Sequence, residues 1–311
     1  MTAATSAAHS KRRIDGVLLL DKPRGVSSNA ALQRAKRLYR AQKAGHTGTL
    51  DPLATGLLPV CFGDATKFAQ VLLDADKTYI AAVRLGVTTT TGDAEGEVVA
   101  TRPVTTSREE LESVLKNFVG RIAQVPPRHS ALKRDGRKYY EYARAGVEIV
   151  RHPREVEIRK MELLSWQSPD LELRVGCGKG TYIRVLAEDI GAALGCGAHL
   201  TGLSRTGSGG FALADAVTLD DLQQLSEAAR DAALLPVDAL VGGLARLDLA
   251  DSDSIRLVQG QAVVRSGLDD GIVRVYTAGG FAGVASVVGG IVRARRLVAQ
   301  NAFAAEPRLL P

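Results

Sequence analysis

The chain has 311 residues, of which 45% are apolar and 24% are charged. These values lie in the range of globular proteins, and the length allows one large domain together with a small one. The 32 glycines indicate many turns and close backbone contacts, which favours a sheet-rich α+β protein over a bundle of long helices.

The formal net charge of +6 is unevenly distributed along the chain. Residues 1–45 hold ten Lys/Arg against two Asp, and residues 128–154 hold eight Lys/Arg against three acidic residues, so the remainder is net acidic. Two basic segments on an acidic body fit a surface that binds a polyanion, and they fit a solvated charged face equally well. Charge alone leaves both interpretations open.

The sequence lacks the motifs of disulfide-rich, zinc-binding, secreted and membrane-spanning proteins. The three cysteines, Cys61, Cys177 and Cys196, show no C-x-x-C spacing, which argues against a disulfide framework or a zinc site and fits a reducing cytosol. Residues 1–10 lack the apolar segment of a signal peptide and are predicted to form a disordered tail. The uncharged stretch 275–292 contains Gly-Gly pairs that predict turns between short strands rather than a membrane span.

The first predicted elements are a strand and a basic helix. The apolar run at residues 16–20 ends in a turn, after which Ser27 or Ser28 caps a helix. Apolar residues at helical spacing form one face of this helix, and Lys and Arg fill the rest of its surface up to Lys43. We expect Gly45 to end the helix and a loop to continue to Gly56.

The middle of the chain alternates strands and helices. Residues 77–99 read as strand, loop and strand, and residues 107–118 as a helix capped by Ser107. A basic, tyrosine-rich block at about 127–153 follows Pro126 and is predicted to be an insertion, because a strand resumes at residues 155–166. Residues 171–195 read as a strand, a glycine loop and a helix.

The helical pattern ends near Leu235, and short alternating segments separated by glycines follow. We therefore predict a large domain at residues 11–240 and a small all-β module at residues 241–311.

The densest chemical signal is GHTGTLDPLATGLLP at residues 45–59, where glycines and threonines surround the single carboxylate of Asp51. An isolated Asp-Pro most often belongs to a turn. A phosphate-binding loop is excluded, because no G-K-[ST] follows and the segment contains no lysine. Composition and spacing do not decide what Asp51 does.

The complete string closely resembles the active-site segment of the TruB family of tRNA pseudouridine synthases. The resemblance continues in order along most of the chain, through GVLLLDKPRGVSS, FGDATKF, DKTYIAAVRLG, PRHSALKRDGRKYYEYARAG, GKGTYIRVLAEDIG and GCGAHLTGLSRTGSGGF. It implies a pseudouridine synthase fold of the α+β class, with a mixed, largely antiparallel central sheet flanked by helices, and a C-terminal module of PUA type. It also implies that residues 127–153 form an RNA-binding thumb.

By this resemblance, the protein is a cytoplasmic, monomeric isomerase that converts the uridine at position 55 in the T loop of tRNA to pseudouridine. The expected partner is the T stem-loop. No metal and no cofactor is expected, because uracil is detached from the ribose, turned and rejoined through carbon 5 without redox change or group donor.

The resemblance assigns three catalytic residues. Asp51 is the catalytic aspartate, which either attacks covalently or acts as a base on the ribose; the sequence does not choose between these routes. Arg184 would pair with Asp51 and keep it ionised. Tyr79 would pack on the target base and assist removal of the proton from carbon 5.

Eleven further residues are expected to contact the substrate. A base inside a folded T loop must be flipped out, and His46 would fill the space that it leaves. Tyr182 and Leu203 would line the uracil pocket, and basic residues would contact phosphates. The remaining candidates are Lys22, Lys43, Thr49, Lys67, Asp93, Lys133, Arg137 and Arg205.

Two positions depart from the family pattern. Ser204 stands where the family usually has an arginine, which puts one phosphate contact in doubt, and Thr90 replaces a common acidic residue. A T-arm binder or tRNA-folding chaperone without catalysis remains the rival class, together with a general RNA-binding protein. The joint presence of Asp51, Arg184 and Tyr79 argues against both.

Overall fold

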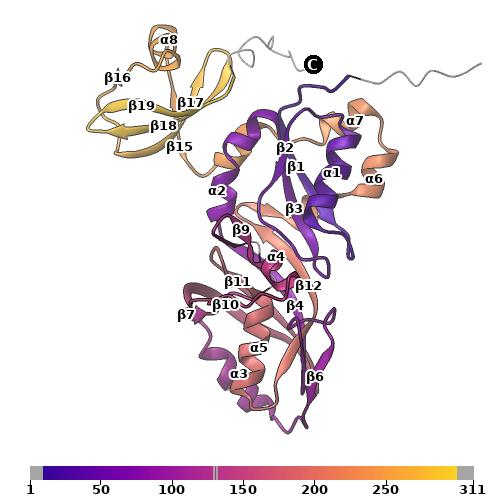
Figure 1. Cartoon of the computed structure of the whole chain (residues 1–311). Helices are drawn as coiled ribbons and strands as arrows, with labels where there is room; N and C mark the ends of the chain where they lie inside the picture. Colours follow the sequence, from indigo (N-terminus) through magenta and orange to yellow (C-terminus); the bar gives the residue numbers. More distant parts are fainter. Residues whose placement is uncertain (1–9, 129, 131, 300–311) are drawn as a thin grey trace, which may run out of the picture.

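The computed structural model describes residues 10–128, 130 and 132–299. The predicted tail at residues 1–10 therefore lies almost wholly outside the described part of the chain. Figure 1 shows an elongated molecule with one large sheet through its length and a second, smaller sheet at one end.

The large sheet contains ten strands and is mixed. Its main path has the order β14-β1-β3-β12-β4-β11-β10-β7, with β13 paired to β12 and β2 paired to β3. Only the β1–β14 and β12–β3 pairs are parallel. The strands are β1 Gly16–Lys22, β2 Ala44–His46, β3 Thr55–Phe62, β4 Lys77–Leu85, β7 Gly120–Gln124, β10 Arg154–Gln167, β11 Asp170–Cys177, β12 Ala198–Ser208, β13 Phe211–Ala212 and β14 Val217–Thr218.

Helices cover the two ends of this sheet. At one end lie α1 Ser28–Leu38, α6 Leu219–Gln224 and α7 Glu227–Ala232; at the other lie α3 Arg108–Lys116 and α5 Ile183–Ala193 (Figure 1). One contiguous core runs beneath them, built from buried aliphatic side chains of the sheet and of α1, α3 and α5. Shorter elements connect the rest: α2 Ala69–Asp74 and the 3₁₀ turns η1 Gly63–Lys67, η2 Leu213–Asp215 and η3 Val237–Val241.

The first helix is capped as predicted but ends earlier than predicted. The Ser27 side chain accepts a hydrogen bond from the Ala30 amide, which fixes the start of α1. The helix stops at Leu38 instead of Gly45, because Arg40 adopts a positive φ of 51° and turns the chain back. Tyr39 holds this end in place, with its ring 4.9 Å from that of Phe62. Lys43 consequently lies outside the helix, and Gly45 belongs to β2.

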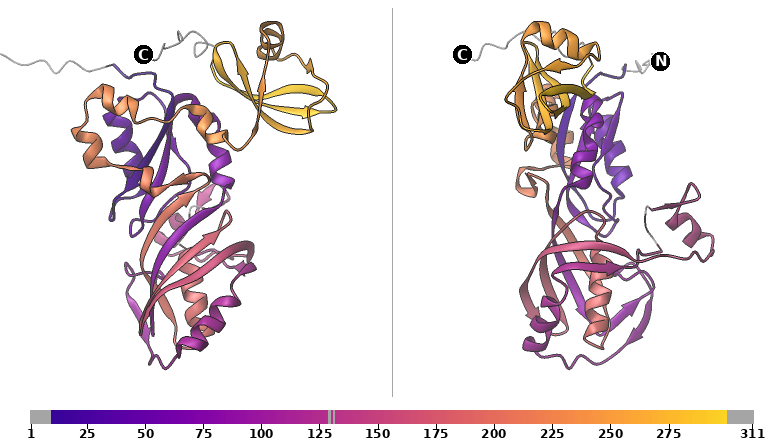
Figure 2. Two further views of the ribbon diagram at one scale, coloured as in Figure 1. Left: turned by 180° about the vertical axis from the view of Figure 1, so that it is seen from behind. Right: turned by 90° about the vertical axis from the view of Figure 1, so that its left-hand side faces the viewer.

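The described residues between β7 and β10 leave the body as a separate arm (Figure 2, right). Its described part contains a two-stranded ribbon, β8 Lys133–Arg134 with β9 Arg137–Lys138, and the short helix α4 Tyr139–Arg144. The arm is inserted between β7 and β10. A second ribbon, β5 Val87–Thr89 with β6 Val98–Thr101, projects from the end of β4.

The C-terminal sheet contains five strands in the order β15-β17-β18-β19-β16. They are β15 Ala245–Asp248, β16 Val263–Val264, β17 Gly271–Thr277, β18 Gly280–Val288 and β19 Ile291–Leu297. The two predicted Gly-Gly turns fall between β17 and β18 and between β18 and β19. The structure adds one helix, α8 Asp251–Val258, which the sequence pattern did not predict. None of the helices within the described residues is long and apolar enough to cross a membrane.

Candidate active site

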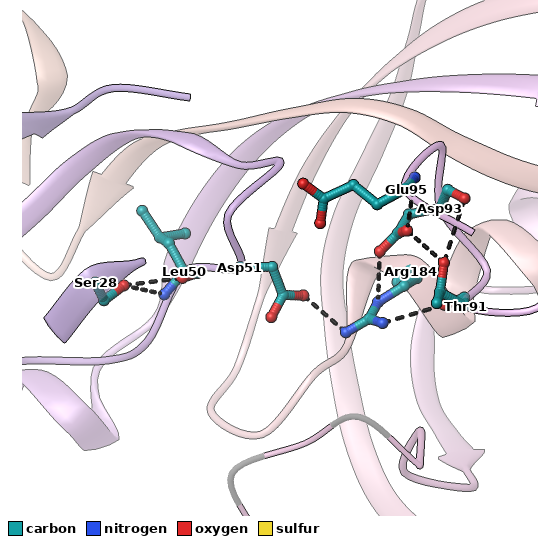
Figure 3. A network of polar contacts seen from close by, with 7 residues as sticks. All are labelled: Ser28, Leu50, Asp51, Thr91, Asp93, Glu95 and Arg184. Carbon is teal, nitrogen blue, oxygen red and sulfur yellow. Dashed lines mark hydrogen bonds and ion pairs between the residues drawn. The ribbon is translucent and has the colours of Figure 1, made fainter. Parts of the chain in front are cut away.

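Asp51 lies in the loop between β2 and β3, and this loop is tied to the body on both sides. Ser28, the first residue of α1, donates from Oγ to the Leu50 carbonyl (2.9 Å) and accepts from the Leu50 amide at 2.8 Å (Figure 3). The Ala54 amide donates to the Asp51 carbonyl at 3.1 Å and closes a turn after the carboxylate. Gly48 has a φ of 94°, which a residue with a Cβ would adopt only under strain.

The Asp51 carboxylate is paired with Arg184 from the second position of α5, as predicted. Arg184 Nη2 donates to Asp51 Oδ2 at 2.8 Å, and Nη1 donates to the Thr91 carbonyl at 3.1 Å. Arg184 Nε lies 3.4 Å from Asp93 Oδ2 (Figure 3). Asp93 is itself fixed, because it accepts from the Glu95 amide and from the Thr91 hydroxyl. One arginine is therefore held between two carboxylates from different loops.

The two carboxylates differ in exposure. The Asp51 side chain is 46% exposed, whereas those of Arg184 and Asp93 are 7% and 5% exposed. A buried guanidinium is costly without anionic partners, so Asp93 stabilises it from the interior and leaves Asp51 facing the open side. This geometry presents one carboxylate to a ligand at a fixed position.

Asp51 borders a pocket of about 300 Å³. Its walls come from strands, loops and helices that are distant in sequence, and they include both tyrosines and the leucine that the sequence predicted. The lining residues include Asp51, Lys77, Tyr79, Ser130, Cys177, Tyr182, Arg184, Leu203 and Arg205. The pocket combines apolar and aromatic walls with a few polar groups, among them the Asp51–Arg184 pair, and such a lining suits a flat, uncharged ring such as a pyrimidine base.

Tyr79 and Arg205 lie deep in this pocket. Burial raises the pKa of Tyr79, so its phenol remains neutral near pH 7. Arg205 is 1% exposed and donates from Nε to the Leu57 carbonyl at 2.7 Å and from Nη2 to the Gly48 carbonyl at 3.2 Å. Arg205 thus holds both ends of the loop that carries Asp51.

A second cavity, of about 480 Å³, also borders Asp51 and lies between the Asp51 loop and the arm. His46, Lys138, Tyr140 and Arg144 line it together with Asp51. The cations of Lys138 and Arg144 lie 5.4 Å and 5.3 Å from the centre of the Tyr140 ring. Burial, with Arg205 and Lys138 nearby, lowers the pKa of His46, so its imidazole is neutral at pH 7.

Three family models match consecutive parts of the chain. The N-terminal domain of TruB family pseudouridylate synthases matches residues 36–183, the C-terminal domain of tRNA pseudouridylate synthase B matches residues 184–242, and the C-terminal region of pseudouridine synthase II TruB matches residues 245–298. The chain belongs to the TruB family of pseudouridine synthases. The three TruB models together span the large sheet, the helices around it and the C-terminal sheet.

Relatives within the TruB family match nearly the full length. The tRNA pseudouridine synthase B of Azoarcus sp. strain BH72 is 55% identical over 93% of this chain and 96% of its own, and that of Burkholderia lata is 56% identical over 96% and 94%. Among solved structures, a Cbf5-Nop10-Gar1 complex matches with a TM-score of 0.71 at 28% identity, covering 93% of this chain and 86% of that one. The predicted α+β pseudouridine synthase fold with a PUA-like C-terminal sheet is thereby confirmed.

The structure places the other candidate residues of this TruB chain in three different settings. Thr49 lies at the border of both cavities. Lys133 and Arg137 are exposed on the arm, and Lys43 is exposed before β2. Arg205 is the exception among the expected phosphate contacts near the pocket, because its guanidinium is buried and directed at backbone carbonyls.

Two lysines that sequence reasoning grouped with the substrate contacts have internal partners. Lys22 is fully buried and donates to the carbonyls of Pro23 (2.9 Å) and Val26 (2.6 Å). Lys67 pairs with Asp64 at 2.9 Å and donates to the Leu297 carbonyl at 3.0 Å, where the body meets the C-terminal sheet. Neither lines the two cavities beside Asp51.

Sequence reasoning placed Tyr140 and Arg144 in the basic, tyrosine-rich block, with Tyr140 as a residue for packing or stacking, but did not include them among the site residues. It did not single out Gln124 or the role of Ser28 in the loop. Tyr140 and Arg144 could have been found from their spacing, since residues four apart lie on the same face of a helix. Gln124 carries no such signal. Within the described residues there is no group of three or more His, Cys, Asp and Glu side chains that could hold a metal ion.

Proposed function

We propose that this chain converts uridine 55 in the T loop of tRNA to pseudouridine, with Asp51 as the catalytic carboxylate. The observation that carries the proposal is the half-exposed Asp51 carboxylate, paired with Arg184 at 2.8 Å at the rim of a pocket of about 300 Å³. The full-length similarity to proteins named tRNA pseudouridine synthase B supports tRNA as the substrate.

The reaction is an isomerisation in which every atom of the nucleotide is retained. The bond from carbon 1 of the ribose to nitrogen 1 of uracil breaks, the base turns, and a bond to carbon 5 forms. Carbon 5 then loses its proton and nitrogen 1, freed from the ribose, gains one, so the composition of the nucleotide is unchanged. Asp51 acts either as a nucleophile or as a base on the ribose, and Arg184 stabilises its negative charge in both routes.

The pocket residues hold the base during its turn. Tyr79, Tyr182 and Leu203 supply apolar surface on which a uracil ring can pack in more than one orientation. Because the pKa of Tyr79 is raised, its phenol is neutral when the uridine binds. Any transfer of the carbon 5 proton through Tyr79 would come after the new glycosidic bond to carbon 5 has formed.

The uridine reaches Asp51 only after it leaves the stacked T loop, at a cost of a few kcal/mol. His46 is on the arm side of Asp51 and is neutral, which suits it to stack in the position that the base vacates. We assign the phosphate contacts to the exposed Lys43, Lys133 and Arg137, and we take the protein to act as a cytoplasmic monomer without metal or organic cofactor.

The decisive variant is Asp51→Asn, which keeps the size of the side chain but removes its charge and its nucleophilicity. We expect pseudouridine formation to fall to the detection limit, while the binding free energy for T-arm RNA changes by less than about 2 kcal/mol, since only one charged hydrogen bond is altered. Pseudouridine mapping and equilibrium binding on one preparation measure both quantities.

The exposed Asp220→Asn serves as the matched control and should behave as the native protein. Normal turnover by Asp51→Asn would remove Asp51 from the mechanism. A protein that only binds the T arm would form no pseudouridine in its native state either, which distinguishes the rival function directly.

A further inference from the structure

Gln124 is an almost fully buried polar residue at the base of the arm. It is the last residue of β7, and it is 1% exposed. Its register partner in the sheet is Arg154, the first residue of β10. The whole arm leaves the body between these two paired residues, so Gln124 marks the point where the arm is anchored.

The Gln124 carboxamide binds both backbone groups of Tyr182. Its Nε2 donates to the Tyr182 carbonyl at 3.3 Å, and its Oε1 accepts from the Tyr182 amide at 3.0 Å. Tyr182 is extended, with φ −104° and ψ 106°, so the carboxamide pairs with it as the backbone of a neighbouring strand would. A hydrophobic residue at position 124 would remove both bonds. The Tyr182 carbonyl would keep the Leu186 amide, which donates to it at 3.0 Å, whereas the Tyr182 amide would lose the acceptor that Gln124 supplies.

Tyr182 is the residue through which this contact reaches the chemistry. Its side chain lines the pocket beside Asp51, and it is the N-cap residue of α5 without a side-chain cap of its own. Arg184, which pairs with Asp51, follows two residues later. The neck of the arm is closed nearby by Arg151, which donates to the Pro126 carbonyl at 2.8 Å.

We propose that Gln124 is a positioning residue for pseudouridine formation, which fixes Tyr182 and the start of α5 against the base of the arm. The inference rests on the proposed function, and no contact between Gln124 and the substrate is required. Loss of the carboxamide should let the pocket wall and the arm move independently, so that bound RNA is no longer aligned with Asp51.

The test compares Gln124→Leu with Gln124→Glu and with the control Val156→Ala, a cavity variant of a buried β10 residue near the same strand pair. With saturating T-arm RNA, we expect the single-turnover rate of Gln124→Leu to fall about tenfold, the factor that corresponds to removing a pair of net hydrogen bonds, while Kd stays within about twofold. Val156→Ala should lose thermal stability without losing rate.

Gln124→Glu should change the rate in a pH-dependent way, which a loss of packing alone would not do. Its carboxylate accepts from the Tyr182 amide but repels the Tyr182 carbonyl, and protonation restores a donor at that position. The ratio of its rate to the native rate should therefore rise as pH is lowered from about 8 to about 6, the range in which a buried carboxylate with a raised pKa gains its proton. This variant keeps the size of glutamine and decides the question if Gln124→Leu fails to fold.

Equal rates for Gln124→Leu and Val156→Ala at equal loss of Tm would overturn the proposal, as would a pH-independent ratio for Gln124→Glu. A rate loss matched by an equal loss of affinity would also overturn it, because Gln124 would then act in binding. Absence of pseudouridine with the native protein would instead refute the proposed function, so the two failures are distinguishable.

Discussion

At the scale of single residues, the site is built around one buried cation. Arg184 is held by Asp93 from the interior and presents its outer nitrogen to Asp51, which is the exposed member of the trio. The charge of Asp51, the proposed catalytic carboxylate, is thus supported by a buried residue, Arg184, that Asp93 holds from the interior. This arrangement makes the effect of each carboxylate separable by mutation.

Asp93→Asn removes the inner charge and keeps the shape of the side chain. Because Arg184 then has Asp51 as its remaining carboxylate partner among those described, we expect the pair to tighten and the single-turnover rate to fall by about tenfold, with RNA affinity unchanged. Asp248→Asn, at an exposed Arg246 pair on the C-terminal sheet, is the control and should keep the native rate. An unchanged rate in Asp93→Asn would show that Arg184 keeps its position without the charge of Asp93.

Lys22 gives a prediction on stability and pH. Burial lowers the pKa of Lys22 from 10.5 to about 8 in the folded protein. Between these two values the unfolded chain holds a proton that the folded protein has released, so this group makes the free energy of unfolding rise with pH in that window. Urea unfolding from pH 8 to pH 10 should therefore show a smaller upward slope for Lys22→Met than for the native protein.

The exposed Lys116→Met is the control for this measurement, since its slope should equal the native one. A Lys22→Met slope equal to that of the native protein would mean that Lys22 releases its proton at the same pH in both states.

At the scale of elements, the arm is the part of the molecule that carries exposed positive charge toward the site. Lys138, Tyr140 and Arg144 of the arm line the cavity beside Asp51, while Lys133 and Arg137 remain exposed on the ribbon. By contrast, some arginines of the basic segment at residues 1–45 already form ion pairs with acidic residues of the protein itself. Arg12 and Arg40 form ion pairs with α7, at Asp231 and Glu227.

Neutralising the arm should weaken RNA binding and reduce its salt dependence. The fourfold variant with Gln at Lys133, Arg134, Arg137 and Lys138 should bind less tightly, and the slope of log K against log salt should fall by about one for each phosphate that the arm no longer neutralises. The matched control places Gln at Arg108, Lys116, Arg121 and Lys160, exposed cations of α3, β7 and β10 outside the arm, and should leave the slope unchanged. Equal slopes for the two variants would identify the arm as a solvated charged face.

At the scale of the whole molecule, the C-terminal sheet is attached to the end of the body away from α3 and α5 (Figure 1). The rings of Phe68 and Phe281 lie 5.5 Å apart across this contact, and the Tyr276 hydroxyl donates to Asp238. The candidate residues that border the pocket and the second cavity all belong to the body and the arm. The C-terminal sheet contributes no lining residue among those that border these two cavities.

The isolated T stem-loop should therefore suffice as a substrate, also in buffer that contains a strong chelator. We expect its single-turnover rate at saturation to lie within about tenfold of that of whole tRNA, because the aligned reacting groups are the same and only remote binding contacts differ. Turnover of whole tRNA without turnover of the stem-loop would shift recognition to the C-terminal sheet. Loss of turnover on both the stem-loop and whole tRNA in the presence of the chelator would reveal a metal requirement.

The sequence by itself determined the features that local chemistry fixes. The GHTGTLDPLATGLLP string identified Asp51 and its turn, the strand, glycine loop and helix around Arg184 were readable from periodicity, and the break in the strand pattern located the arm. These features depend on residues adjacent in the chain, so their signal survives without knowledge of neighbours in space. The matched strings then carried the family and its fold.

The tertiary structure alone decided which polar residues face the pocket and which face the interior. Lys22, Lys67 and Arg205 look alike as basic residues in a sequence. Lys67 and Arg205 donate to carbonyls of segments that are distant in sequence, and Lys22 is fully buried against carbonyls of the turn that follows it. The end of α1 at Leu38 depends on Tyr39 packing against β3, and the role of Gln124 depends on α5 lying beside β7. Such roles are set by the order of strands in the sheet and by burial, which no local pattern encodes.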